Sequence, residues 1–367
     1  MAFSNRPVLV FWETTRACSL ACVHCRASAI DSPLPGELTT EEGFDLLDEI
    51  TSFCKPYPLL IFTGGDPLKR TDIFQQIKRA REKGINCALS PAVSWMLTDT
   101  ALNDIKKSGC NSISISLDGC SAETHDSIRK VSGTYEKTLS VIKKAVDIGL
   151  KVQINTTVMD KNLIELPGIF HIVKSLGVDT WELFFLIKTG RGTGVMDVDS
   201  ATSEDICNFV YDASFYGVII RCVEAPFIRR VVALRESGNH AQGGEIYNRM
   251  RKELLESDGL PVSAVSTLSK TGTLDGDGTI FIGYDGSIYP GGFLPCKIGD
   301  IKRNSLIDVY RNNPLLKSIR NREFAGQCGI CQFKHVCGGS RARAYAYNKD
   351  PLGTDPACIV ACPAAKV

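Results

Sequence analysis

The sequence has no excess charge of either sign. Its 42 lysines and arginines balance 41 aspartates and glutamates, for a net charge of +1 over 367 residues. A nucleic-acid footprint and a polybasic membrane surface both need a surplus of basic residues, so we expect neither kind of partner.

Long hydrophobic runs and repeats are absent as well. No apolar run reaches the ~18 residues of a membrane-spanning helix, and PVLVFW near the start is too short for the hydrophobic region of a signal peptide. We find no internal repeat and no low-complexity segment. The sequence therefore predicts a cytoplasmic protein without a transmembrane segment.

Cysteine, in contrast, is abundant. Fifteen cysteines occur in a 40.0 kDa chain, and two groups of them are closely spaced. In a chain of this size without a secretion signal, clustered cysteines favour metal binding, with disulfides as the alternative. Other cysteines stand singly, where this residue is usually a small buried hydrophobe: Cys54, Cys87, Cys110, Cys120, Cys207 and Cys222.

Short β-rich runs alternate with amphipathic segments from residue 7 to about residue 190. Six runs are apolar on both faces and are joined through helix-like segments, which predicts a parallel sheet covered by helices. We expect an α/β fold built on a partial (β/α)6 barrel. The expected strands are VLVFWETT, PLLIFTGG, NCALSPA, SISISLDG, KVQINTTV and WELFFLI, and the expected helices are Thr40 to Phe53, Asp72 to Lys83, Thr98 to Ser108, Tyr135 to Ile148 and Leu163 to Leu176.

The pattern weakens after about residue 200. A helix near Ser203 to Tyr216 and a strand over VIIRCVEAP precede a polar stretch, Glu236 to Gly278, which we interpret as a surface loop or linker. TIFIGYDGSIYPGGF predicts a hairpin with Asp285 and Gly286 at its turn. The expected division is residues 1–200 as the barrel, 201–278 as bridging helices and linker, and 279–367 as a smaller hairpin-plus-helix domain.

The first cysteine group directly follows the first expected strand. Cys18, Cys22 and Cys25 form C-x3-C-x2-C. Zinc sites usually close with four ligands, so three thiolates better suit an iron-sulfur cluster with one iron left open, with zinc as the alternative. This spacing, placed before a repeated strand–helix pattern, resembles the radical S-adenosylmethionine (SAM) superfamily, whose members hold a 4Fe-4S cluster this way and bind SAM at the open iron.

The resemblance implies SAM contacts where the later strands end. TGGDPL stands where the family has GGE-P, with aspartate replacing glutamate. Without the resemblance, TGGDPL would be interpreted as a glycine-rich turn after a strand, and Arg129 as a solvated charge at the end of a helix. The implied contacts are Gly64, Gly65 and Asp66 for the methionine amino group, Ser116 and Arg129 for its carboxylate, and Asn155, Phe185, Leu186 and His24 for the ribose and adenine.

The second cysteine group lies in the tail, at Cys328, Cys331, Cys337 and Cys358. Four thiolates in one segment can close an iron-sulfur cluster or a tetrahedral zinc site. The spacing resembles the SPASM extension of radical SAM enzymes, which would make this segment an iron-sulfur domain. The full SPASM pattern has two further cysteines, and Arg341 and, approximately, Gly291 stand in their places. We therefore expect two 4Fe-4S clusters, one that binds SAM and one auxiliary, and leave open whether Cys296 or Cys362 is a ligand.

The resemblance also implies a reaction. The reduced cluster would cleave SAM to methionine and a 5'-deoxyadenosyl radical, which removes a hydrogen atom from the substrate. A ferredoxin or flavodoxin would supply the first electron, and the auxiliary cluster would accept the electron that the substrate releases.

The tail suggests a substrate. CGGSRARAYA, then DP and a final cysteine, is similar to the haem-biosynthesis branch (Ahb/Nir type), which implies oxidative decarboxylation of propionates on an iron tetrapyrrole. The alternatives are peptide modification, as in the maturation of ribosomal peptides, and a non-catalytic metal-binding scaffold. Five arginines are candidates to hold substrate carboxylates, unless they only form a solvated face or a cap: Arg26, Arg229, Arg230, Arg341 and Arg343.

Overall fold

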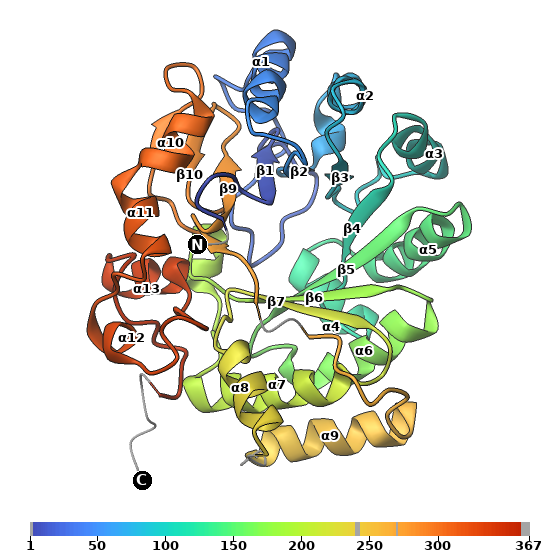
Figure 1. The fold of residues 1–367 in the computed structure, drawn as a ribbon. Coiled ribbons are helices and arrows are strands. Elements are labelled where there is room, and N and C mark those ends of the chain that lie inside the picture. Colours follow the sequence, from blue (N-terminus) through green and yellow to red (C-terminus); the bar gives the residue numbers. More distant parts are fainter. Residues whose placement is uncertain (1–2, 239–242, 269–270, 361–367) are drawn as a thin grey trace.

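The computed structural model describes residues 3–238, 243–268 and 271–360 (Figure 1). One mixed sheet runs through this part of the chain in the order β11-β10-β9-β1-β2-β3-β4-β5-β6-β7, with β8 beside β9. Every neighbouring pair from β9 to β7 is parallel. The strands are β1 (Leu9–Glu13), β2 (Leu59–Thr63), β3 (Cys87–Leu89), β4 (Ser112–Ser116), β5 (Lys151–Val158), β6 (Thr180–Phe185), β7 (Ile219–Val223), β8 (Leu274–Asp275), β9 (Gly278–Ile282), β10 (Ser287–Tyr289) and β11 (Gly299–Asp300).

Helices cover the outer face of this sheet, as Figure 1 shows for α1, α2, α3, α5 and α6. The helices are α1 (Thr40–Thr51), α2 (Ile73–Glu82), α3 (Asp99–Lys107), α4 (Ala122–Arg129), α5 (Thr134–Asp147), α6 (Leu166–Ser175), α7 (Ser200–Ala213), α8 (Ile228–Glu236), α9 (Glu245–Asp258), α10 (Leu306–Asn312), α11 (Pro314–Arg320), α12 (Gly326–Ile330) and α13 (Arg341–Asn348). Short 3-10 turns occur at η1 (Pro67–Lys69), η2 (Leu163–Glu165) and η3 (Gly190–Gly194).

The predicted partial barrel is confirmed. Each of the six apolar runs contains one of the strands β1 to β6, and the five expected helices correspond to α1, α2, α3, α5 and α6. Hydrophobic alternation and helix caps explain the agreement; α1, for example, begins with a capping box between Thr39 and Glu42. The short helix α4 was missed, because its eight residues carry mostly polar side chains.

The polar stretch after α8 is not only a loop or linker, so this prediction is wrong. It contains the 14-residue helix α9, which packs on α6 and α7. Tyr247, Met250 and Leu254 are its buried side chains, spaced three and four residues apart along one face. The other positions are largely charged, which hid the amphipathic pattern.

The predicted hairpin is confirmed as β9 and β10. Gly283 donates its backbone N–H to the Ser287 carbonyl at 2.8 Å, which closes the loop at Asp285 and Gly286. Strand β9 also pairs in parallel with β1, in the register Leu9 to Thr279. The C-terminal segment therefore continues the barrel sheet, and the three-part division by residue number stays a prediction.

The two faces of the sheet differ in chemistry. Trp12, Phe62 and Trp181 are fully buried, and their side chains belong to the apolar core between strands and helices. Burial of side chains of this kind contributes roughly 1.5–3 kcal/mol each. Successive side chains of a strand alternate in direction, so their neighbours face the concave interior of the open barrel.

The cysteines that stand singly are mostly buried, as predicted. Cys87, Cys110 and Cys207 are buried, and Cys120 and Cys222 are half-buried. Cys54 is exposed just after α1, so the prediction is wrong at that position. No disulfide joins cysteines within the described residues. Within residues 3–238, 243–268 and 271–360, no helix is long and apolar enough to cross a membrane.

Candidate functional site

The first cysteine group lies in the loop between β1 and α1. Cys18 and Cys22 are buried and Cys25 is half-buried. The loop is closed at its base by a bridge between Ala17 and Ile30, where the Cys18 N–H donates to the Ile30 carbonyl at 2.7 Å. The three thiols are thus confined to one compact loop at the carboxyl ends of the barrel strands.

Each of the three sulfur atoms accepts a hydrogen bond. The backbone N–H of Leu20 donates to Cys18 Sγ at 3.4 Å, and that of Ala29 donates to Cys25 Sγ at 3.5 Å. Arg129 Nη1 lies 3.5 Å from Cys22 Sγ. Burial raises the pKa of the Cys18 thiol to about 11, so a metal would have to displace its proton on binding. Hydrogen-bond donors directed at the sulfur atoms favour the thiolate form, which is the form that binds an iron-sulfur cluster.

The predicted glycine segment after β2 lies directly against this loop. Gly65 and Asp66 donate their backbone N–H groups to the carbonyls of Thr15 and Ala17, both at 2.7 Å. A Cβ on Gly65 would collide with the Ala17 carbonyl oxygen and lie 2.8 Å from that of Arg16. Glycine is therefore required at residue 65 for the close approach of two backbones.

The side chain of Asp66 turns inward, away from solvent. Its Oδ1 accepts from the Leu68 N–H at 3.2 Å, and its Oδ2 accepts from Ser94 Oγ at 2.6 Å. Burial raises the pKa of Asp66, and these hydrogen bonds act in the opposite direction. Asp66 thus joins the β2 end to the loop after β3, and its predicted contact with SAM stays a prediction.

Replacing Gly65 with alanine is expected to displace the cysteine loop. Forcing a methyl group between two backbones costs roughly 1–3 kcal/mol, and here the strain falls on the carbonyls of Arg16 and Ala17. The variant should retain less iron than the wild type after anaerobic reconstitution, measured per chain. Gly194→Ala is the matched control, because a Cβ there meets no atom within 4 Å. Equal iron content in both variants would contradict the prediction.

Arg129 connects the cysteine loop to the end of β4. Its Nη2 forms an ion pair with Asp118 Oδ2 at 2.5 Å. Burial alone would raise the pKa of Asp118, but the Arg129 guanidinium holds it below its usual value. Arg129 is therefore a fixed, charged side chain beside Cys22, not a solvated charge at a helix end.

His24 and Asn155 occupy different surroundings. His24 Nε2 lies 3.8 Å from Asp118 Oδ2, and its Nδ1 is buried with no hydrogen-bond partner among the described residues. Burial lowers the pKa of His24 to about 4, so the ring is neutral. Asn155 lies on β5 opposite Ser116 on β4, and its Oδ1 accepts from Gln153.

Phe185 is the last residue of β6, and Leu186 follows it. Both side chains are buried. The Phe185 ring packs at a right angle on Phe227, 5.6 Å between centroids. The Leu186 carbonyl accepts from Arg343 Nη2 at 3.2 Å. Arg343 thus already uses this carbonyl, and adenine recognition by the FFLIK backbone stays a prediction.

The turn η3, which the sequence did not single out, supports the cysteine loop. Arg191 donates from Nε to the Cys22 carbonyl at 2.8 Å and from Nη1 to the Ala29 carbonyl at 2.7 Å. A Cβ on Gly190, whose φ is +54°, would collide with the Arg26 carbonyl. The only sequence signal was the glycine-rich GRGTG after the sixth strand.

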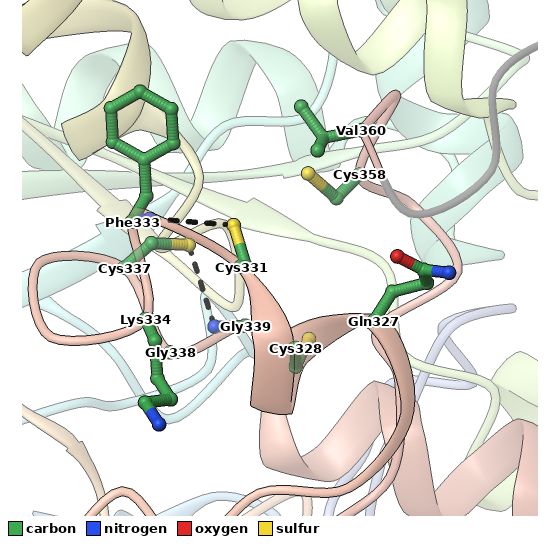
Figure 2. Close-up of a pocket in the computed structure, with 10 residues that line it drawn as sticks. All are labelled: Gln327, Cys328, Cys331, Phe333, Lys334, Cys337, Gly338, Gly339, Cys358 and Val360. Carbon is green, nitrogen blue, oxygen red and sulfur yellow. Dashed lines mark hydrogen bonds between the residues drawn. The ribbon is translucent and has the colours of Figure 1, made fainter.

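The tail cysteines line one pocket (Figure 2). The four cysteines surround one space, and Phe333, Lys334 and Val360 also line it. Cys328 and Cys337 are buried, whereas Cys331 and Cys358 are half-buried. Within the described residues, no group of three or more His, Cys, Asp or Glu side chains could hold a metal ion. Four thiols around one pocket are the feature that fits an iron-sulfur cluster.

Backbone N–H groups reach three of these sulfurs. Phe333 donates to Cys331 and Gly339 donates to Cys337, both at 3.4 Å. Cys328 Sγ accepts from the Asp355 N–H at 3.4 Å. The tail site thus repeats the pattern of the loop site, with sulfurs that are both sheltered and hydrogen-bonded.

The two positions that lack the SPASM cysteines are filled by other side chains. Arg341 is 1% exposed and donates to the Gly353 carbonyl at 2.8 Å and to Cys328 Sγ at 3.6 Å. A Cβ on Gly291 would overlap the carboxylate of Asp275. Cys296 packs near Leu294 and Ala342 and does not line the pocket. Cys362 lies outside the described residues.

The arginines offered for substrate carboxylates are already bound within the protein, which corrects that interpretation. All five donate to protein groups: Arg26 to Glu13, Arg229 to the Thr273 and Val336 carbonyls, Arg230 to Glu204, Arg341 to the Gly353 carbonyl, and Arg343 to Asp355 and the Glu224 carbonyl. Some of these partners lie far away in the chain, such as the Val336 carbonyl for Arg229 and the Glu224 carbonyl for Arg343, so the sequence did not reveal them.

Comparisons with known proteins agree with this geometry. A family model described as the Radical SAM superfamily matches residues 12–171. The AdoMet-dependent heme synthase of Methanosarcina barkeri is 34% identical over 365 residues, which cover 98% of this chain and 98% of that protein. The Fe-coproporphyrin III synthase of the same organism is 28% identical, with 97% of this chain and 88% of that protein covered.

Two solved structures share the fold. SuiB of Streptococcus suis bound to S-adenosylmethionine aligns with a TM-score of 0.65 and 14% identity, over 96% of this chain and 77% of that one. The anSMEcpe structure with bound AdoMet has the same TM-score and identity, over 96% of this chain and 94% of that one. The protein is an enzyme that uses SAM and a 4Fe-4S cluster, which overturns the scaffold alternative, and its chain belongs to the radical SAM superfamily.

Proposed function

We propose that this enzyme acts in haem biosynthesis and oxidatively decarboxylates propionate side chains of an iron tetrapyrrole. The observation that carries the proposal is the 34% identity to a heme synthase over 98% of both chains. The pre-heme d1 synthase of Dinoroseobacter shibae, 30% identical over 97% of this chain and 86% of that protein, is a further relative with a haem-related name.

The chain's own residues prepare the site for this chemistry. When bound, the cluster and SAM supply a 5'-deoxyadenosyl radical that takes a hydrogen atom from a substrate carbon. We assign Cys18, Cys22 and Cys25 to the cluster, and Arg191 to holding their loop in place. The Arg129 guanidinium offers a fixed positive charge beside Cys22 for the methionine carboxylate.

The remaining SAM contacts keep their predicted roles in this proposal. His24 is a neutral ring with an unpartnered nitrogen, which suits a nearby adenine. Ser116, the last residue of β4, pairs with Asn155 in β5. Gly64 and Gly65 hold the β2 end against the cysteine loop, and burial of Cys18 and Cys22 limits the access of water to the reacting atoms.

We further propose that the tail cysteines hold one auxiliary 4Fe-4S cluster. Loss of a hydrogen atom and CO2 turns a propionate into a vinyl group and releases one electron, so a one-electron acceptor is needed. Cys328, Cys331, Cys337 and Cys358 all line the same pocket. A ferredoxin or flavodoxin is the proposed donor of the first electron, and cytoplasmic location stays a prediction.

Iron analysis tests the number of clusters. We expect about eight irons per chain after anaerobic reconstitution, because two 4Fe-4S clusters are formed. Cys328→Ala should lower the count to about four, while Cys54→Ala, at an exposed free thiol, should leave it unchanged. About twelve irons in the wild type would overturn the single auxiliary cluster.

The proposed reaction is tested by anaerobic incubation of the reconstituted, dithionite-reduced protein with SAM and iron-coproporphyrin III. We expect stepwise loss of CO2 from the porphyrin, by mass spectrometry, in proportion to the 5'-deoxyadenosine released. A reaction without SAM is the control. Release of 5'-deoxyadenosine with an unchanged porphyrin would reject the substrate and keep the radical chemistry.

Peptide modification is the second candidate. The mycofactocin maturase MftC of Mycobacterium tuberculosis is 27% identical over 97% of this chain and 83% of that protein. If the porphyrin is unchanged in the experiment above, SAM cleavage stimulated by a peptide would favour this candidate. The higher identity to the heme synthase makes decarboxylation the first choice.

A further inference from the structure

A polar network lies on the last three parallel strands of the barrel. Gln153 on β5 donates its amide to Asn155 Oδ1 and to Glu182 Oε2 on β6, both at 2.8 Å. Arg221 on β7 donates from Nη1 to Gln153 Oε1 at 3.4 Å. These four side chains therefore form one connected group across three strands.

The network faces the inside of the barrel. Trp181, next to Glu182, is fully buried, and its ring lies 5.7 Å from that of Phe170 on α6. Ile220, next to Arg221, is 1% exposed and belongs to the same core. Because side chains alternate along a strand, Glu182 and Arg221 point away from the covering helices and toward the concave side of the sheet.

The register of the strands puts Arg221 level with the predicted SAM contacts. Ser116 pairs with Asn155, Asn155 pairs with Glu182, and Glu182 pairs with Arg221. These residues form one rung across β4 to β7. A substrate group held by Arg221 would thus lie on the rung that carries Ser116 and Asn155.

Arg221 differs from the other arginines near the site. It is exposed, and β7 is the edge strand on this side of the barrel sheet. Within the residues that the structure describes, it is the one arginine inside a strand, and it forms no ion pair within 4.0 Å. The five arginines considered above all donate to protein groups, whereas the Arg221 guanidinium makes one long hydrogen bond.

The Glu182 carboxylate does not completely neutralise the positive charge of the Arg221 guanidinium. Burial raises the pKa of Glu182 to about 7, while Arg221 and Gln153 act to lower it. Near neutral pH a fraction of the Glu182 side chains is therefore protonated. The rung therefore keeps a positive charge at Arg221, on the edge strand β7.

We propose that Arg221 is the substrate anchor inside the barrel, where its guanidinium binds a carboxylate of the porphyrin and Gln153 holds it in position. The inference rests on the proposed function, since it takes a carboxylate-bearing substrate as given. A planar guanidinium matches a carboxylate with two parallel hydrogen bonds. A porphyrin with several carboxylates can keep one of them bound to Arg221 while another reaches the reacting position.

Kinetics with iron-coproporphyrin III test the anchor. Arg221→Gln should raise the KM for this porphyrin about 10- to 100-fold, the loss expected for a hydrogen bond to a charged group. The kcat should change little, and Arg221→Lys should recover part of the affinity. Release of 5'-deoxyadenosine without porphyrin is measured in the same variant, and a rise in KM that exceeds any change in this release assigns the effect to porphyrin binding. Arg249→Gln, on the exposed face of α9, is the matched control.

A binding titration distinguishes recognition of the carboxylate charge of the porphyrin from recognition of its shape. Soret-band titration should show that Arg221→Gln weakens binding of the free acid but not of its tetramethyl ester. Equal KM values in Arg221→Gln and Arg249→Gln would overturn the anchor and leave the decarboxylation intact. A wild type that does not decarboxylate this porphyrin would reject the proposed function, and the anchor would fall with it.

Discussion

Cys22→Ala should abolish the release of 5'-deoxyadenosine from SAM. Cys22 is one of three thiols in the loop, and its sulfur also accepts from Arg129 at 3.5 Å. Without it the loop offers two thiolates, which cannot hold a 4Fe-4S cluster with a single open iron. Arg129 would also lose the negative partner beside its guanidinium. Anaerobic incubation with dithionite and SAM, followed by mass spectrometry, measures the effect.

The same variant should keep the tail site. Its iron content is expected to fall from about eight to about four per chain, because the auxiliary cluster remains. Circular dichroism identical to that of the wild type would show that the fold is intact. Cys54→Ala is the control, since that thiol is exposed just after α1. Wild-type release of 5'-deoxyadenosine by Cys22→Ala would reject the assignment of this loop.

Arg343→Ala is expected to lower the free energy of unfolding by about 3–5 kcal/mol, the cost of breaking a buried ion pair. Arg343 is 1% exposed and lies 3.5 Å from Asp355, which is fully buried. It also donates to the carbonyls of Glu224 at 2.7 Å and Leu186 at 3.2 Å. One side chain thus joins the tail to the ends of β6 and β7. Urea denaturation followed by tryptophan fluorescence measures the change.

The control for this experiment is an arginine with little contact to the rest of the protein. Arg303 is exposed in the turn after β11, and Arg303→Ala should change stability by less than about 0.5 kcal/mol. Equal denaturation midpoints for the two variants would show that the tail does not depend on Arg343. A large loss for Arg343→Ala alone would identify it as the main polar link between tail and barrel.

The link also bears on function. The tail pocket and the cysteine loop both hold their sulfurs with hydrogen bonds, and Arg343 binds the tail to the barrel at the Leu186 carbonyl, just after β6. If electrons pass between the sites, weakening this link should slow decarboxylation more than it slows SAM cleavage.

The sequence by itself determined the partial barrel and the two cysteine groups. Apolar runs separated by amphipathic segments encode strands and helices locally, so β1 to β6 were predicted in order. Spacings such as Cys18-x3-Cys22 concern residues near in sequence, so they too can be recognised without a structure. The helix α9 was missed because its apolar face is narrow and its other positions are charged.

Only the tertiary structure decided what the polar side chains do. Arg343 donates to the Leu186 carbonyl, 157 residues away in the sequence, and Arg191 donates to the Cys22 carbonyl, 169 residues away. The same holds for β9, which pairs with β1 from the far end of the chain. Hydrophobic periodicity predicts the elements, but a buried charge takes whichever partner the folded chain brings within reach. For that reason the arginines that looked available in the sequence are bound, and Arg221, which the sequence did not single out, faces the barrel interior.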